Sequence, residues 1–162
     1  MIGLPPSAGA SSSVVAPSTI DSTGAADVTD KLLAFIAGVP DGSTISFPAN
    51  ARYRIEGSLI IEGRRDLTFE GNNAEFFATT EADRNRRHWW IRNSDGITIR
   101  DIAVRGANPN AGVGDAAYRS DREAQQGFDF AGTSNTLVER VTVTDVYGDF
   151  VYFDQPDLPR PM

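Results

Sequence analysis

The sequence predicts an all-β fold of the β-solenoid class, in which short strands stack as successive coils. Three observations predict it. Segments of alternating polar and apolar residues recur from residue 59 onward, Gly, Asn and Asp separate them, and the basic period is about 23 residues. Because one coil cannot bury its apolar face alone, neighbouring coils must stack and share a core. The repeats indicate a solenoid of about four coils.

The period follows from aligning the apolar segments without gaps. Residues 59–62 align with 89–92 at an offset of 30 residues, and residues 89–91 align with 128–130 at an offset of 39. Residues 128–130 then align with 151–153 at an offset of 23. We expect the two longer offsets to contain insertions, in the polar stretch 79–87 and in the Gly/Asn/Asp-rich stretch 107–124.

This alignment predicts which side chains face the core and which face solvent. One inward column contains Leu59, Trp89, Phe128 and Val151, and a second contains Phe69, Ile99 and Val138. Two outward columns alternate in charge, namely Glu70, Arg100 and Glu139, and Glu62 with Arg92. Opposite charges on neighbouring strands attract, so we interpret these columns as structural ladders.

One helix is expected before the repeats. An apolar stripe at helical spacing is formed by Val28, Leu32, Phe35 and Ile36. Asp27 is a natural N-cap, Gly38 a natural residue just past the helix, and Pro40 a stop. Residues 44–47 then alternate polar and apolar, which predicts a half-buried strand.

Length and composition limit the class of protein. The 162 residues suffice for one domain, and 40% of them are hydrophobic. The net charge of −7 argues against a nucleic-acid partner, because a phosphate backbone attracts a basic face. No apolar run approaches the roughly 20 residues of a membrane-spanning helix. The sequence contains no cysteine, so disulfides and thiolate metal sites are excluded.

The two ends differ in composition from the middle. We expect residues 1–20 to form a flexible lead-in or linker, without the basic and apolar regions of a clear signal peptide. Residues 21–153 are the predicted solenoid domain, and residues 154–162, with three prolines, an irregular tail. The domain is expected to be truncated at its C-terminal side. Its last coil would present an apolar edge, to which a second copy or another chain could bind.

Several segments resemble a known superfamily. Residues 21–27, the helix, and residues 40–48 and 53–55 resemble the N-terminal entry of right-handed parallel β-helix proteins of the pectate-lyase-like and polygalacturonase-like kind. Residues 93–101 look like a standard coil of that superfamily. The resemblance implies a right-handed parallel β-helix with an N-terminal capping helix. It also implies a polysaccharide partner and an extracellular or cell-surface location.

The resemblance also indicates one candidate site. In polygalacturonase-like enzymes, catalytic carboxylates lie on consecutive coils at one turn-to-strand junction. Here Gln126 and Asp149 occupy such positions on consecutive coils, and the same register places Arg87 beside Gln126. Asp149 is therefore the candidate catalytic acid, although a turn residue is the alternative interpretation. Gln126 and Gly148 replace acids of the family pattern, so the catalytic set is incomplete.

Two function classes therefore stay open. The first is a carbohydrate-active protein that resembles lyases or hydrolases of acidic glycans, present here as an N-terminal fragment. The alternative is a non-catalytic module for glycan binding or adhesion, or a structural solenoid. The sequence does not decide whether the chain is an enzyme.

A second candidate site is the outward column of Ile60, Trp90, Asp129 and Tyr152. Exposed aromatic rings stack on the C–H faces of sugars, and a neighbouring carboxylate accepts hydrogen bonds from hydroxyl groups. In the alternative interpretation, the insertion 107–124 folds over Trp90 and buries it.

The sequence gives little support for a metal or cofactor. Pectate-lyase-like enzymes hold Ca²⁺ with clusters of acids, so the resemblance makes Asp115 and Asp121 weak candidate ligands. Their spacing matches no calcium-loop motif, and a solvated loop is the favoured interpretation. His88, the single histidine, is expected at a turn or rim.

Overall fold

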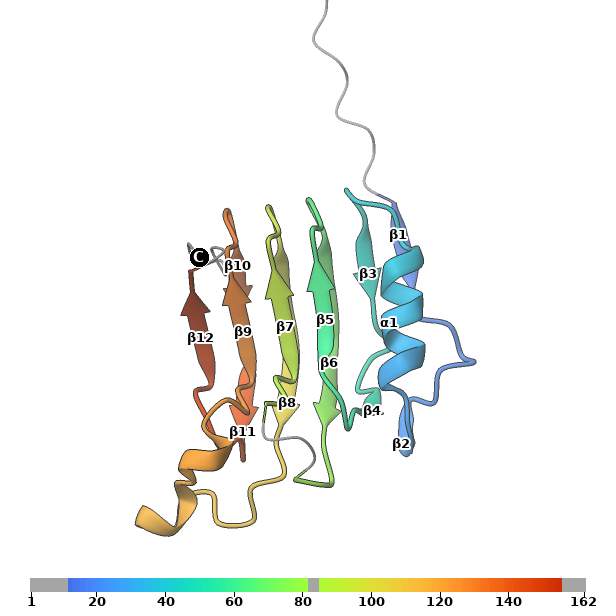
Figure 1. Cartoon of the computed structure of the whole chain (residues 1–162). Coiled ribbons are helices and arrows are strands. Elements are labelled where there is room, and N and C mark those ends of the chain that lie inside the picture. The colour runs from blue at the N-terminus through green and yellow to red at the C-terminus, as the bar shows by residue number, and fades with distance from the viewer. Residues whose placement is uncertain (1–11, 82–84, 156–162) are drawn as a thin grey trace, which may run out of the picture.

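The computed structural model describes residues 12–81 and 85–155, which form a mostly β structure with one α-helix (Figure 1). The elements are β1 (Ser13–Val15), β2 (Thr23–Asp27), α1 (Thr29–Gly38), β3 (Thr44–Ser46), β4 (Arg52–Arg54), β5 (Leu59–Glu62), β6 (Thr68–Phe77), β7 (Trp89–Arg92), β8 (Thr98–Arg105), β9 (Phe128–Ala131), β10 (Leu137–Glu139), β11 (Thr142–Thr144) and β12 (Val151–Asp154). Two short 3₁₀ helices, Gly114–Ala117 and Ser120–Arg122, lie between β8 and β9.

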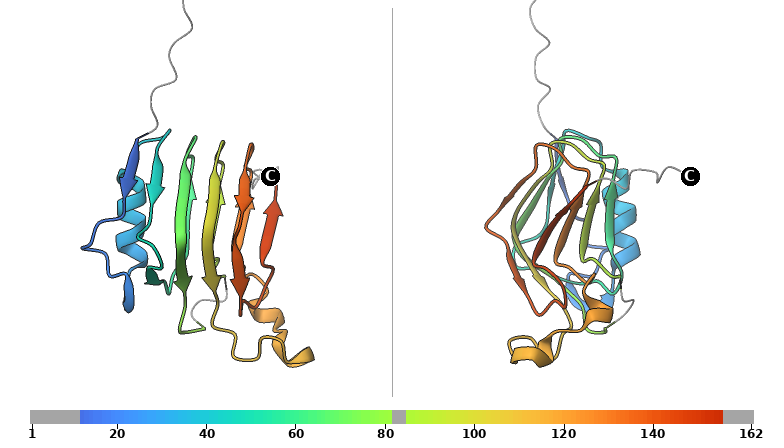
Figure 2. Two further views of the ribbon diagram at one scale, coloured as in Figure 1. Left: turned by 180° about the vertical axis from the view of Figure 1, so that it is seen from behind. Right: turned by 60° about the vertical axis from the view of Figure 1, so that its left-hand side comes forward.

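All strand pairs of the described residues are parallel, and they form two sheets. Sheet B contains β5, β7, β9 and β12. Sheet A contains the other eight strands, and its long members β6 and β8 change register part-way along. From β5 onward the chain passes alternately between the sheets, so strands far apart in sequence lie side by side (Figure 2). The predicted mostly-β class with parallel strands is confirmed.

The register agrees with the sequence alignment. Trp89 pairs with Leu59 on one side and Phe128 on the other, and Val151 pairs with Phe128. The second inward column pairs in the same way, with Ile99 between Phe69 and Val138. Val151 is 37% exposed because β12 is the edge strand of sheet B in the described part of the chain.

The core is centred on an aromatic cluster around Trp89. Its ring centroid lies 4.9 Å from that of Phe76, 5.2 Å from Phe69, 6.1 Å from Phe128 and 6.5 Å from Phe47. These rings come from both sheets, so the cluster ties sheet B to sheet A. Aromatic pairs at such distances contribute beyond the area they bury.

The turns that follow the strands of sheet B repeat one backbone conformation. Gly63, Asn93 and Gly132 occupy equivalent positions, and each has a positive φ between 46° and 67°. Three residues later, Asp66, Gly96 and Asn135 do so again, with φ between 50° and 70°. Gly, Asn and Asp tolerate this left-handed region best, which explains why these residue types separate the repeats.

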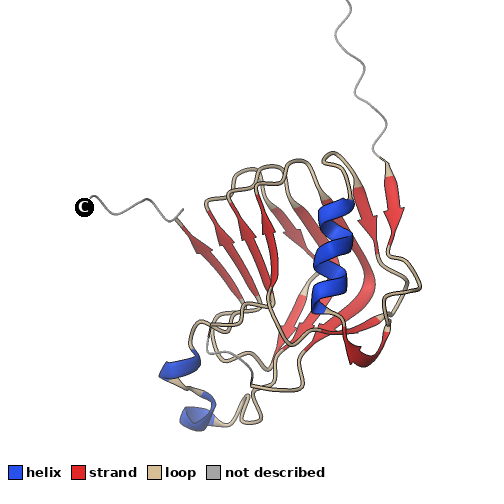
Figure 3. Cartoon of the chain, turned by 45° about the vertical axis from the view of Figure 1, so that its right-hand side comes forward, coloured by secondary structure: helices blue, strands red, loops and turns tan. Residues whose placement is uncertain are grey.

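Helix α1 packs against β5 at one end of sheet B (Figure 3). The N-cap position is Val28, and the neighbouring Asp27 accepts a hydrogen bond from the Thr29 N–H at 3.0 Å. At the other end, the Arg64 guanidinium donates to the carbonyls of Ile36 at 3.0 Å and Val39 at 2.5 Å. Arg64 thus supplies donors that the last turn of a helix lacks.

The beginning of the chain differs from the expected lead-in over residues 1–20. Strand β1 pairs with β3, and both Ala16 and Ile20 are buried in the core. Residues 12–20 are therefore part of the folded unit, while residues 1–11 lie outside the described residues. At the other end, β12 continues to Asp154, and of the expected tail 154–162 the residues 156–162 are not described.

We expect Trp89→Ala to lower the free energy of unfolding by about 3–5 kcal/mol, because it removes the centre of the aromatic cluster and leaves a cavity. Equilibrium urea denaturation measures the change. Val113→Ala is the control: Val113 is 61% exposed, and its loss should stay within about 0.5 kcal/mol. Equal losses for the two variants would contradict this description of the core.

Candidate functional site

The column Arg87, Gln126 and Asp149 lines one hollow of about 330 Å³ beside the outer face of sheet B. Its other lining residues are Asn85, Ser120, Asp121, Glu123, Ala124, Tyr152 and Asp154. The structure therefore brings together the three residues that the register predicted to be neighbours, and it adds Tyr152 from the second candidate column. Their roles in binding or catalysis stay predictions.

Backbone hydrogen bonds between successive repeats align this column. The His88 N–H donates to the Gln126 carbonyl at 3.0 Å, and the Gly127 N–H donates to the Asp149 carbonyl at 3.0 Å. The parallel pairing of β7, β9 and β12 thus extends into the residues that precede each strand. The positions of Arg87, Gln126 and Asp149 in the hollow therefore follow from the register of these strands.

Arg87, one of the lining residues, forms an ion pair with a buried carboxylate. Arg87 Nε donates to Asp129 Oδ2 at 2.5 Å, and Asp129 is only 3% exposed. Burial raises the pKa of Asp129, and the Arg87 guanidinium opposes that rise without cancelling it. The second carboxylate oxygen, Oδ1, has no hydrogen-bond partner within residues 12–81 and 85–155.

The predicted outward column is present, but it is not an aromatic platform. Trp90 pairs with Ile60 and Asp129, and Tyr152 pairs with Asp129, as expected. The Trp90 ring, however, is half-buried and lies under two guanidinium groups, 4.3 Å from that of Arg87 and 4.6 Å from that of Arg92. Trp90 thus lies between the exposed ring and the buried ring that the sequence left open, and cation–π contacts with these two arginines use part of its surface.

The insertion 107–124 contributes one wall of the hollow. Its Glu123 carbonyl lies so close to Gly148 that a Cβ atom at position 148 would collide with it. The Gly148 N–H donates to the Gln125 carbonyl at 3.0 Å. Glycine at 148 therefore lets this insertion pack closely against the segment before β12.

Sequence reasoning missed Glu123 and Asp154 as lining residues. Asp154 could have been found, because it follows Tyr152 by two residues on the same face of a strand. Glu123 carried no such signal, since it lies on an insertion without repeat periodicity.

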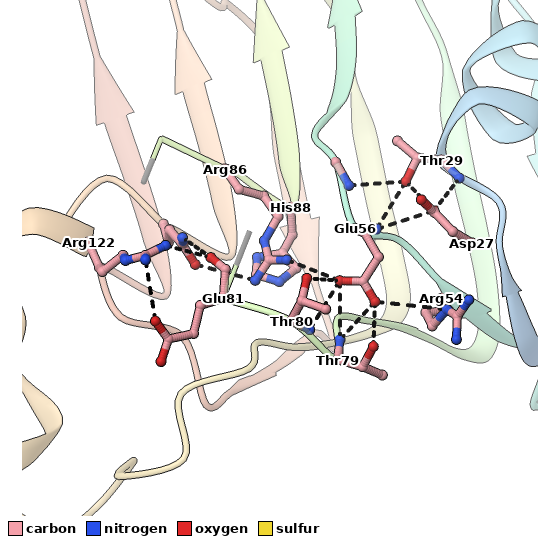
Figure 4. A network of polar contacts seen from close by, with 12 residues as sticks. Asp27, Thr29, Arg54, Glu56, Thr79, Thr80, Glu81, Arg86, His88 and Arg122 are labelled. Atoms are coloured by element: carbon pink, nitrogen blue, oxygen red, sulfur yellow. Dashed lines mark hydrogen bonds and ion pairs between the residues drawn. The ribbon is translucent and has the colours of Figure 1, made fainter. Parts of the chain in front are cut away.

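His88 lies in a bend directly before β7, in line with the expected turn, but it is not at a rim, because its side chain is completely buried (Figure 4). Its Nδ1 atom lies 2.9 Å from the Gln126 carbonyl, which only accepts, so Nδ1 carries the proton. No described residue bonds to Nε2. Burial lowers the pKa of His88 from 6.5 to about 4, and the nearby Arg86 acts in the same direction, whereas the Gln126 hydrogen bond opposes it.

A polar network next to His88 holds the start of insertion 79–87 (Figure 4). The Glu56 carboxylate accepts hydrogen bonds from the backbone and hydroxyl groups of both Thr79 and Thr80. Burial would raise the pKa of Glu56, but these hydrogen bonds outweigh it and lower that pKa. The buried Arg86 lies 3.5 Å from Glu56 and 3.3 Å from Gln125. None of these residues lines the hollow, so this network holds the start of the insertion and is not part of the candidate site.

The weak metal candidates are not brought together. Asp115 is exposed on a 3₁₀ helix, and Asp121 is ion-paired with Arg119 at 2.9 Å. Within the described part of the chain, no group of three or more His, Cys, Asp or Glu residues is arranged to hold a metal ion. The same residues contain no helix that is both long and apolar enough to cross a membrane.

No protein-family model, curated protein or solved structure matches the chain. The resemblance to parallel β-helix proteins thus rests on the residues quoted for it, and it stays a prediction.

The buried His88 predicts a loss of stability in mild acid. Between pH 6.5 and about 4 the unfolded chain binds a proton at this residue and the folded chain does not, so lowering the pH favours unfolding. The full shift corresponds to about 3 kcal/mol. We expect His88→Asn, whose amide also donates to the Gln126 carbonyl but does not titrate, to show a flatter decline. Urea unfolding at pH values from 7 to 5 measures the free energy of unfolding of both proteins. Parallel curves of this free energy against pH would refute the role of His88.

Proposed function

We propose that the chain is part of a right-handed parallel β-helix protein and that it binds polysaccharide at the hollow. The parallel pairing, the alternation of the chain between two sheets and the constant register support the β-helix. Helix α1 at the end of sheet B is where the resembling proteins have their capping helix. An extracellular or cell-surface location is part of the same proposal.

The lining of the hollow is the observation that carries the binding proposal. Tyr152, 38% exposed, offers an aromatic ring, while Gln126 and Asp149 offer groups that bond to hydroxyls. The volume of about 330 Å³ lies at the lower end of the range of about 300–1,000 Å³ for small-molecule pockets. An aromatic ring beside several polar groups suits a sugar, which has both C–H faces and hydroxyls.

Glycan cleavage is a second candidate function. Hydrolysis of a glycosidic bond uses two carboxyl groups, one as acid and one as base or nucleophile. Asp149 and Asp154 both line the hollow, so a second carboxylate accompanies the predicted catalytic acid. A calcium-assisted lyase reaction is proposed from the resemblance alone.

Docking of another chain is a third candidate. The final strands and the segment before β12 expose large apolar side chains, among them Leu137, Phe150 and Phe153. Since β12 also forms the edge of sheet B among the described strands, a second copy or another β-structured chain could pair with it.

We expect Tyr152→Ala to weaken glycan binding about two- to tenfold, the worth of one aromatic contact. A glycan array identifies a ligand, and titration calorimetry then compares the variants. Tyr118→Ala is the matched control, because Tyr118 is 60% exposed and does not line this hollow. An array without any bound glycan, or equal losses for the two variants, would contradict the proposal.

A further inference from the structure

The charges that line the hollow are mostly negative. Among the described residues, the lining contains four carboxylates, of Asp121, Glu123, Asp149 and Asp154, and one guanidinium, that of Arg87. Arg87 is already bonded to the buried Asp129, and Asp121 is bonded to Arg119.

Three of these carboxylates have no cationic partner. Within the described part of the chain, no Lys, Arg or His forms an ion pair with Glu123, Asp149 or Asp154. Unneutralised carboxylates grouped around one hollow attract a positive ligand and repel a negative one.

A buried oxygen beside these carboxylates also lacks a donor. Gln126 lines the hollow and is only 6% exposed, and its Oε1 accepts no hydrogen bond from any described residue. A buried acceptor without a partner costs free energy, so Oε1 of Gln126 favours a ligand that donates hydrogen bonds.

We propose that the hollow binds a sugar unit carrying a protonated amine and disfavours a uronate. This inference rests on the proposed glycan-binding function and names its substrate class. An ammonium group has three hydrogen-bond donors and no acceptor, and the sugar hydroxyls can donate further hydrogen bonds. The Tyr152 ring is available for the C–H face of the same sugar.

The charge of the hollow opposes the acidic glycan that the family resemblance implies. A uronate would place its carboxylate among those of Glu123, Asp149 and Asp154, and the guanidinium of Arg87 is shared with Asp129. One unit-charge contact near 4 Å changes affinity about fivefold in water. This contact raises the affinity for the protonated amine and lowers the affinity for the uronate.

The test compares three trimers of one size by titration calorimetry: glucosamine, N-acetylglucosamine and galacturonic acid. At about pH 6 and low ionic strength, where charges are screened least, we expect the glucosamine trimer to bind about fivefold more tightly than the acetylated one and the uronate to bind most weakly. A uronate that binds as tightly as the glucosamine trimer, or an acetylated trimer that equals it, overturns the inference and leaves glycan binding intact. If none of the three binds, the proposed function fails together with the inference.

A matched pair of variants locates the effect. Asp149→Asn should weaken glucosamine-trimer binding about fivefold and leave the acetylated trimer within about twofold. Asp115→Asn removes an equal charge from an exposed position outside the hollow and should change neither. Trilysine tests charge alone: binding as tight as that of the glucosamine trimer would show that the sugar is not recognised. Equal losses of affinity for the glucosamine trimer in the two variants would show that the amine does not bind near Asp149.

Discussion

Trp89 is buried between Leu59 and Phe128, and this burial fixes the register of sheet B. Because side chains alternate along a strand, a slip of one residue would turn this ring to solvent and move Trp90 into the core. The same register places Arg87 beside Gln126, just before strands β7 and β9. The hollow is thus a consequence of how the core packs.

The walls of the hollow depend on a second, more local constraint. Insertion 107–124 approaches the backbone at Gly148, and a polar network around Glu56 and Arg86 holds Thr79 and Thr80. These contacts are made by backbone atoms and buried charges, not by the repeating apolar pattern. An irregular polar segment is thereby held against a regular sheet, an arrangement that often carries function because a rigid scaffold positions the loop.

Much of the fold, but only part of the candidate site, was predictable from the sequence. Alternation and gap-free offsets predicted the partners of Trp89 because the apolar side of each strand must be buried. They did not predict the burial of His88, whose polar ring bonds to the Gln126 carbonyl next to the core. They also missed the two arginines over Trp90, since a strand pattern says which face a side chain points to but not what covers it.

If strand register assembles a glycan-binding hollow from residues on successive repeats, a bound glycan should perturb residues that are distant in sequence. This is measured by mapping backbone amide shifts in a ¹⁵N-labelled sample during titration with the glucosamine trimer. We expect the largest shifts to fall together at Arg87, Gln126, Asp149 and Tyr152, which share the hollow. Shifts centred on helix α1 or on sheet A, with none at these four residues, would contradict it.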